Sequence, residues 1–271
     1  MRRRNLTPKT ITVFISMCVL AIVMLYPFVF MINTSFKSKA QYFGAPGHST
    51  ASWGKLFQTL PVAQQLLNST VVCAGAISII LLVSTMAGFA IAKMRSKATP
   101  ILFLGIVGAM LIPLQSIIIP AYINASKLNL LNGYWGAIFV YAALGSPFAT
   151  FLMTSYFRGI PEDLVEAAIV DGLSYPKVFL KIGLPLAVPA IITVIVLQFI
   201  QVWDDLLVGL LFIQEPTYRT ITVGLGALSA GRVTDIPVLM AGSLISAIPA
   251  VVVYLIFQRQ LVNGLTAGIG K

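Results

Sequence analysis

The sequence predicts an all-α integral membrane protein, a bundle of six transmembrane helices in one domain that covers residues 1–271. Hydrophobic residues make up 58% of the chain and charged residues only 10%, and the mean hydropathy is +0.93. A soluble core of this size cannot bury so many apolar side chains. The apolar runs are continuous and reach the length of about 20 residues that a spanning helix needs. They lack the alternating pattern of barrel strands, which favours helices.

Six stretches meet this length, and we expect spans at 11–32, 67–92, 100–123, 135–157, 186–207 and 237–258. The first follows Arg2, Arg3 and Arg4, as the apolar part of a secretory leader would. Its run is long, however, and Tyr26-Pro27 stands where a small-residue cleavage pattern would be. We therefore expect a retained first span.

The positive charges indicate the orientation of the bundle. Twelve Lys and Arg residues fall on the side of the two termini, and six fall on the other side. The twelve are Arg2, Arg3, Arg4, Lys9, Lys93, Arg95, Lys97, Arg158, Lys177, Lys181, Arg259 and Lys271. Because cytoplasmic loops carry the excess of such residues, both termini, the loop at 158–185 and the tail at 259–271 are expected in the cytoplasm. The net charge of +10 reflects this topology; no nucleic-acid-binding motif accompanies it.

The loop at 158–185 is the most distinctive segment, because it is polar and acidic between two apolar stretches. Pro161 followed by Glu162 and Asp163 fits the start of a helix, where acidic groups meet the positive end of the dipole. Gly172 can supply the left-handed residue that ends it. The sequence thus predicts a short amphipathic helix of about three turns. Its apolar side has two pairs at four-residue spacing, Leu164 with Ala168 and Val165 with Ile169.

Two features of this helix favour a protein partner. Ala167 and Ala168 leave one face nearly flat, which permits close approach by another surface. Asp171 places a negative charge at the unfavourable end of the helix dipole. A helix lying on lipid headgroups would more often carry Lys or Arg on its polar face, whereas this one carries acids.

The spacing of these residues resembles the EAA signature of the membrane subunits of binding-protein-dependent ABC importers. The matching positions are Glu166, Ala167, Ala168, Asp171, Gly172, Phe179, Ile182, Leu184 and Pro185. The resemblance implies the six-helix fold of the type I importer permeases and assigns these nine residues to coupling with an ATPase. In that family the loop docks in a groove on the cytoplasmic ATPase subunit and carries its motion to the membrane helices.

Further matches narrow the resemblance to the carbohydrate-uptake (maltose-type) permeases. They lie at Asn68-Ser69, 87–90, Met94-Arg95, Ile112-Pro113, 202–205, Gln258-Arg259 and 264–268; many relatives have Asn at the position of Asp204. The tail resembles that of one subunit type, represented by the second maltose permease. This implies an ATPase contact through Gly264, Leu265 and Thr266, whereas the glycine-rich composition alone indicates a frayed end.

Polar residues inside spans are candidates for the solute path, because they are costly in hydrocarbon. The candidates are Gln115, Ser146, Gln198, Gln201, Trp203 and Asp204, with Thr193 and Asp205 nearby. Amides, carboxylates and an aromatic face are the groups that bind sugars, whose hydroxyls need donors and acceptors. Some of these polar side chains can instead bond neighbouring helices. A sugar is favoured over an anion, although related permeases also move glycerol phosphate esters.

The chain has no phosphate loop of the GxxxxGK[ST] type, no metal-ligand cluster and no catalytic constellation. We expect no enzyme activity and no cofactor on this chain; ATP and Mg would bind the partner ATPases. The implied partners are a second, different permease subunit, two copies of an ABC ATPase, an extracytoplasmic solute-binding protein and membrane lipid. The alternative is an ion-coupled secondary transporter, which would show inverted repeats and paired ionisable groups near mid-membrane.

Overall fold

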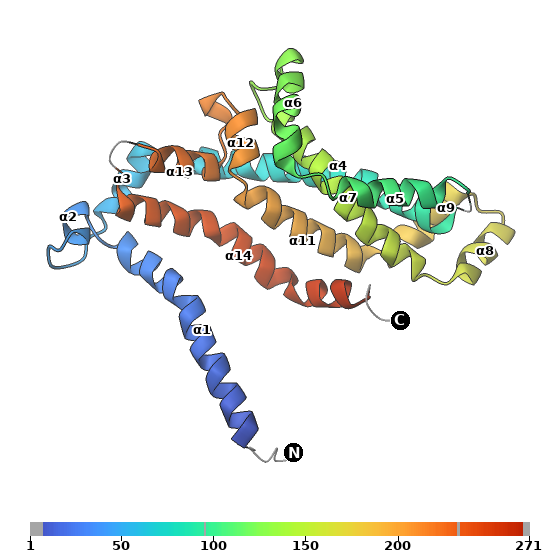
Figure 1. Cartoon of the computed structure of the whole chain (residues 1–271), viewed down its shortest axis with the longest axis horizontal. Helices are drawn as coiled ribbons and strands as arrows, with labels where there is room; N and C mark the ends of the chain where they lie inside the picture. The colour runs from blue at the N-terminus through green and yellow to red at the C-terminus, as the bar shows by residue number, and fades with distance from the viewer. Residues whose placement is uncertain (1–7, 95, 232–233, 268–271) are drawn as a thin grey trace. The chain divides into compact units, whose positions relative to one another are not determined.

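The computed structural model describes residues 8–94, 96–231 and 234–267, with side chains between residues 10 and 260 (Figure 1). The described residues form helices and contain no strand, which confirms the expected all-α fold. The long helices are α1 (Pro8–Ser35), α4 (Val62–Lys93), α7 (Trp135–Arg158) and α14 (Ile236–Ala267). Each is long and apolar enough to cross a membrane.

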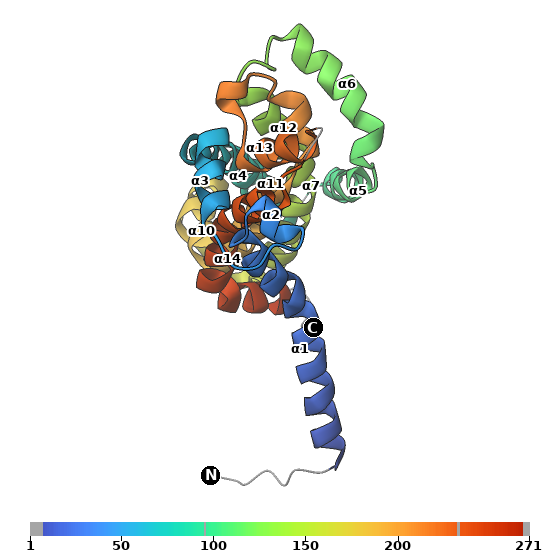
Figure 2. The ribbon, with the colours of Figure 1, turned by 90° about the vertical axis from the view of Figure 1, so that its left-hand side faces the viewer.

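By length and composition the described chain has these four spans, or six if each of two bent helix pairs counts as one span. The expected third span is divided into α5 (Thr99–Ala109) and α6 (Leu114–Lys127), which meet at 95°. Figure 2 shows this sharp turn. Pro113 stands at the junction in an extended conformation. A proline also disfavours helical backbone at the residue before it, here Ile112, which explains the break.

The second bend, of 72°, separates the segment Tyr175–Leu186 from α11 (Val188–Asp204). That segment consists of α9 (Tyr175–Val178), a π-helical turn η1 (Phe179–Gly183) and α10 (Leu184–Leu186). Pro189 occupies the first turn of α11, where its missing N–H costs nothing. The expected fifth span at 186–207 therefore ends as a helix at Asp204.

The remaining helices are shorter. They are α2 (Lys39–Tyr42), α3 (Ala51–Thr59), α8 (Glu162–Val170), α12 (Leu207–Phe212), the 3-10 turn η2 (Pro216–Tyr218) and α13 (Ile221–Ser229). The backbone of α14 is helical to Ala267, so the helix includes part of the glycine-rich tail.

The chain divides into two compact units. The first comprises residues up to 62 and 227–247, and the second comprises residues 63–226 and those from 248 onwards. Helices α13 and α14 therefore contribute residues to both units.

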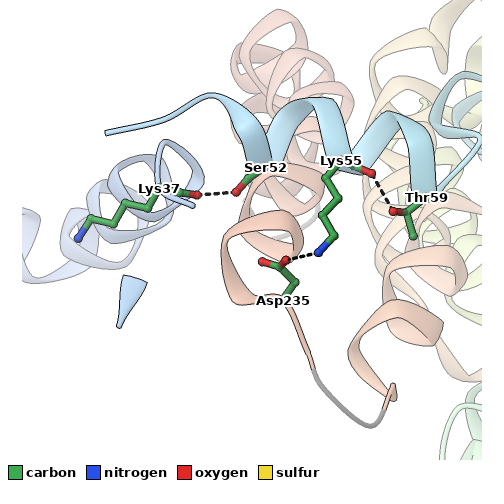
Figure 3. Close-up of polar contacts among 5 residues, drawn as sticks. All are labelled: Lys37, Ser52, Lys55, Thr59 and Asp235. Atoms are coloured by element: carbon green, nitrogen blue, oxygen red, sulfur yellow. Dashed lines mark hydrogen bonds and ion pairs between the residues drawn. The ribbon is translucent and has the colours of Figure 1, made fainter. Parts of the chain in front are cut away.

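The first unit holds α1, α2, α3 and the start of α14. Most apolar side chains of α1 are more than 40% exposed, as expected for a helix that faces lipid or another protein. Polar contacts fix α3 (Figure 3): the Ser52 hydroxyl donates to the carbonyl of Lys37, and the ammonium of Lys55 lies 2.7 Å from Asp235 Oδ2. The second contact joins α3 to the residue that precedes α14.

The second unit is organised around α7, which packs against α5, α6, α11 and α12. Its apolar core joins α4, α7, α8, the α9–η1 segment and α11. The buried members are Ile80, Phe89, Ala142, Ala149, Met153, Phe157, Ile160, Val165, Ala168, Val178, Ala187, Ala190 and Val194. The loop at 158–185 is therefore packed onto the membrane helices and not free of them.

Candidate functional site

Helix α8 forms where the acidic pattern predicts it. It begins at Glu162 after an extended Pro161 and carries Glu162 and Asp163 in its first turn. Gly172 has a φ of +85°, the left-handed conformation in which glycine carries no side-chain penalty. The Gly172 N–H donates to the Ile169 carbonyl over 2.9 Å, and the Leu173 N–H donates to the Ala168 carbonyl over 3.0 Å. This pair of bonds is the Schellman motif, so the expected helix stop is confirmed.

The two faces of α8 differ from the expectation at Ala168 and at Leu164, which is 43% exposed. Val165 and Ala168 are each 6% exposed and belong to the apolar core. Ala168 thus faces the protein, and only Ala167 of the two alanines is exposed. Glu166 is also exposed, and Val170 is 86% exposed. The surface open to a partner therefore combines a carboxylate, a small residue and an apolar side chain that sequence reasoning did not select.

The other residues of the predicted coupling set fall into two groups. Asp171, Gly172 and Pro185 are exposed. Phe179 and Ile182 are partly buried and pack against the core, and Leu184 is partly buried. The exposed group is available to a partner, while the packed group joins the loop to the membrane helices.

A small cavity lies between α8 and the last residue of α4. Its volume is about 100 Å³, and it is lined by Lys93, Glu162, Val165, Glu166, Ile169 and Tyr175. Lys93 is only 8% exposed. Sequence reasoning used this lysine only as a topology charge, because a single lysine at a span end carries no signal of burial.

The solute-path candidates lie in different environments. Gln115 on α6, and Gln201 and Asp204 on α11, are exposed. Ser146 lines a hollow of about 440 Å³ between α4, α5 and α7, and its hydroxyl donates to the Ala142 carbonyl over 2.6 Å. These four side chains are accessible in the isolated chain.

Two candidates are buried. Trp203 is 3% exposed, and its ring stacks on Phe199 with centroids 5.1 Å apart. Gln198 is 1% exposed, and its Nε2 has no hydrogen-bond partner. Gln198 lies against Gly145 of α7, where a Cβ would come within 2.4 Å of its Oε1. Thr193 is likewise buried and donates to the Pro189 carbonyl within α11.

Asp205 has a structural role at the break between α11 and α12. Its Oδ1 accepts from the Tyr141 hydroxyl at 2.9 Å and from the Val208 N–H at 2.8 Å. The second bond satisfies a free N–H at the start of α12, as a capping residue does. Asp204, the neighbouring residue, lies at the exposed end of α11.

Asn68 near the start of α4 binds a segment that lies far away in the sequence. It is fully buried, and its Nδ2 donates to the carbonyls of Thr217 and Arg219, both at 2.9 Å. Its Oδ1 accepts from Gln64 Nε2 and from the Tyr134 hydroxyl. Burial, with the nearby Tyr218, raises the pKa of the Tyr134 phenol. The next residue, Ser69, accepts from the Ile221 N–H at 3.0 Å.

The tail residues with an expected ATPase contact, Gly264, Leu265 and Thr266, lie in the last turns of the α14 backbone. Their side chains lie outside the described set. Among the described residues, no group of three or more His, Cys, Asp or Glu side chains is placed to hold a metal ion.

The sequence matches a known protein family and several named relatives. Residues 10–266 match the model of the binding-protein-dependent transport system inner membrane component. A trehalose/maltose transport system permease of Thermococcus litoralis is 32% identical over 97% of both chains. A sulfoquinovosyl glycerol transport system permease of Agrobacterium fabrum is 30% identical over 94% of this chain and 92% of its own.

A solved structure has the same fold. It is a bacterial ABC transporter involved in the import of the acidic polysaccharide alginate, and one of its chains superposes with a TM-score of 0.81. The superposition covers 96% of this chain and 98% of the other, at 21% sequence identity. The described helices, with their two bent pairs, therefore have the fold of an ABC importer permease.

Proposed function

The chain belongs to the family of binding-protein-dependent transport system inner membrane components, and from this premise we propose that it is the permease subunit of an ABC importer for a sugar or oligosaccharide. The family match over residues 10–266 is the observation that carries the proposal. The protein is an inner membrane transport component. The two relatives reported above both move sugar compounds, by their names.

The exposed polar residues of the second unit support a neutral, hydroxyl-rich solute. Gln115, Gln201 and Asp204 supply amide and carboxylate groups, which pair with hydroxyls as donors and acceptors. No Lys or Arg is among these path candidates, and an anionic solute would call for one. Glycerol phosphate esters are the other solute class known in related permeases, and they are the second choice for that reason.

The energy for transport comes from ATP hydrolysed by two copies of a separate ABC ATPase. Helix α8 docks on one ATPase copy through Glu166, Ala167, Val170 and Asp171, all exposed in this chain. From the positive-charge distribution we expect α8, the N-terminus and the end of α14 in the cytoplasm. There the last turns of α14, with Gly264, Leu265 and Thr266, reach the ATPase dimer.

The other partners follow from the transport cycle. A second, different permease subunit forms the other half of the pathway, and the apolar surface of α1 is available to it or to lipid. An extracytoplasmic binding protein delivers the solute. This chain itself hydrolyses no nucleotide.

The first test is purification of the tagged chain from its native membranes in a mild detergent, with mass spectrometry of everything that accompanies it. We expect one ATPase, a distinct permease and a solute-binding protein. A tagged membrane protein of another class from the same membranes is the control for adventitious capture. Recovery of the chain alone, under conditions that keep known importers intact, would overturn the proposal in favour of an ion-coupled transporter.

A further inference from the structure

The cytoplasmic end of α4 holds a lysine in a buried position. Lys93 is the last residue of α4 and is 8% exposed. Its ammonium donates to the carbonyl of Ile160, in the link between α7 and α8. The carboxylate of Glu162 in the first turn of α8 also interacts with this ammonium electrostatically. A buried ammonium is costly unless it is paired, so the contact ties α4 to the beginning of the loop.

A second side chain of α4 contacts the other end of the loop. Phe89 lies one turn before Lys93, on the same side of the helix, and is 4% exposed. Its ring meets Phe157 edge to face, with centroids 5.4 Å apart, and the ring of Phe179 lies at 5.3 Å. A Cβ on Gly183 would come within 3.0 Å of the Phe89 ring. Two successive turns of α4 thus hold the loop on both sides of α8.

The rest of α4 is suited to carry a displacement along its length. It has 32 residues and no proline, which at 1.5 Å per residue makes a rod about 48 Å long. Helices α1, α6, α7 and α14 each contain an internal proline, where a helix can bend. At its other end α4 binds the 217–221 segment through Asn68 and Ser69.

We propose that α4 is the element that transmits movement of α8 to the 217–221 segment, with Lys93 and Phe89 as its attachment to the loop. This inference rests on the proposed importer function. Lys93 is a positioning residue: it touches neither solute nor nucleotide, and it makes α4 follow α8 when the ATPases move. Helix α7 is joined to α8 by the chain itself, whereas α4 depends on these side-chain contacts.

The test uses the complete importer complex in lipid nanodiscs with three variants. Lys93→Met keeps the length of the side chain but cannot donate to Ile160. Lys93→Arg restores a donor and the charge. Lys97→Met, at an exposed lysine in the link between α4 and α5, is the matched control. The readouts are co-purification of the ATPase, the stimulation of ATP hydrolysis by loaded binding protein, and solute uptake.

We expect Lys93→Met to keep the ATPase subunits bound while stimulation and uptake fall at least about tenfold, a loss equivalent to about 1.4 kcal/mol of coupling free energy. Lys93→Arg should recover most of both, and Lys97→Met should match the wild type. Wild-type stimulation and uptake in Lys93→Met would overturn the inference. If Lys93→Met does not assemble, Phe89→Leu tests the inference by the same criteria. This variant removes the ring contact with Phe179 and keeps the charge of Lys93. Failure of the wild-type chain to bind any ATPase would instead contradict the proposed function.

Discussion

Tyr141 of α7 and Asp205, at the break between α11 and α12, are joined by a hydrogen bond of 2.9 Å from the phenol to the carboxylate. The same carboxylate oxygen accepts the Val208 N–H, so one side chain fixes both the position of the break and the start of α12. We expect Tyr141→Phe to destabilise the purified complex by about 2 kcal/mol, because a bond to a charged acceptor is lost. Asp205→Asn, which keeps an acceptor, should cost less than Asp205→Ala.

Thermal unfolding in detergent with solute bound and unbound measures these differences. Tyr122→Phe is a matched control, since its hydroxyl bonds only the exposed Gln214 side chain. Equal stabilities for Tyr141→Phe and Tyr122→Phe would contradict the structural role given to Asp205.

Gly145 of α7 faces the ends of two buried side chains, Gln198 of α11 and Ile80 of α4. A Cβ at this position would lie 2.4 Å from Gln198 Oε1 and 2.6 Å from the Ile80 side chain. Overpacking of this kind typically costs about 1–3 kcal/mol, so Gly145→Ala should lower the melting temperature and the yield of folded protein. Gly105→Ala on α5 meets nothing within 4 Å and is the control. A Gly145→Ala variant as stable as Gly105→Ala would show that the Gln198 and Ile80 side chains accommodate a methyl group without loss of stability.

Local signals predicted the parts of the loop that depend on local physics. The start of α8 after Pro161 and its stop at Gly172 follow from the helix dipole and from left-handed backbone, both readable from neighbouring residues. The side on which Ala168 packs was not readable, because it depends on which face of α8 meets the apolar core of the second unit. Two adjacent alanines carry no information about that choice.

Other features were missed because they depend on residues far apart or on a short interruption. The bonds of Asn68 to the carbonyls of Thr217 and Arg219 join positions about 150 residues apart, and no sequence pattern links them. The break near Pro113 does not show in the hydropathy averaged over the length of a span, because the residues on both sides of it are apolar. Burial of Lys93 is equally invisible, since its partner is a backbone carbonyl.

Charge reversal on the exposed surface of α8 tests docking. We expect Glu166→Lys to weaken ATPase association at least about tenfold, a loss of about 1.4 kcal/mol of binding free energy, and to abolish uptake with normal amounts of permease in the membrane. Quantitative co-purification measures the association. Glu215→Lys, at an exposed carboxylate before η2, has the same change of charge away from the loop and should bind the ATPase normally. Unchanged recovery of the ATPase with Glu166→Lys would show that α8 is not part of the docking surface.

The left-handed backbone of Gly172 gives a second, sterically different test of the loop. Its φ is +85°, and no atom lies within 4 Å of the Cβ that a substitution would add. A β-branched residue is strained there while asparagine is tolerated, so Gly172→Val should disturb the end of α8 and Gly172→Asn should not. We expect Gly172→Val to raise the ATP hydrolysed per solute imported, measured in proteoliposomes. Equal stoichiometry in the two variants would mean that the end of α8 plays no part in coupling.

The solute-path proposal is tested best at residues that can be changed without damage to the fold. Gln201 is exposed near the end of α11, so Gln201→Ala should leave thermal stability unchanged while the KM for uptake rises several-fold, because an amide that pairs with solute hydroxyls is lost. Trp203 is 3% exposed, and Trp203→Ala would open a cavity that costs about 3–5 kcal/mol, which confuses binding with stability. Trp203→Phe keeps an aromatic ring beside Phe199 and is the better variant. Gln58→Ala, an exposed glutamine on α3, controls for the substitution itself. If Gln201→Ala and Trp203→Phe both transport the same range of sugars at the wild-type rate, neither residue belongs to the solute path.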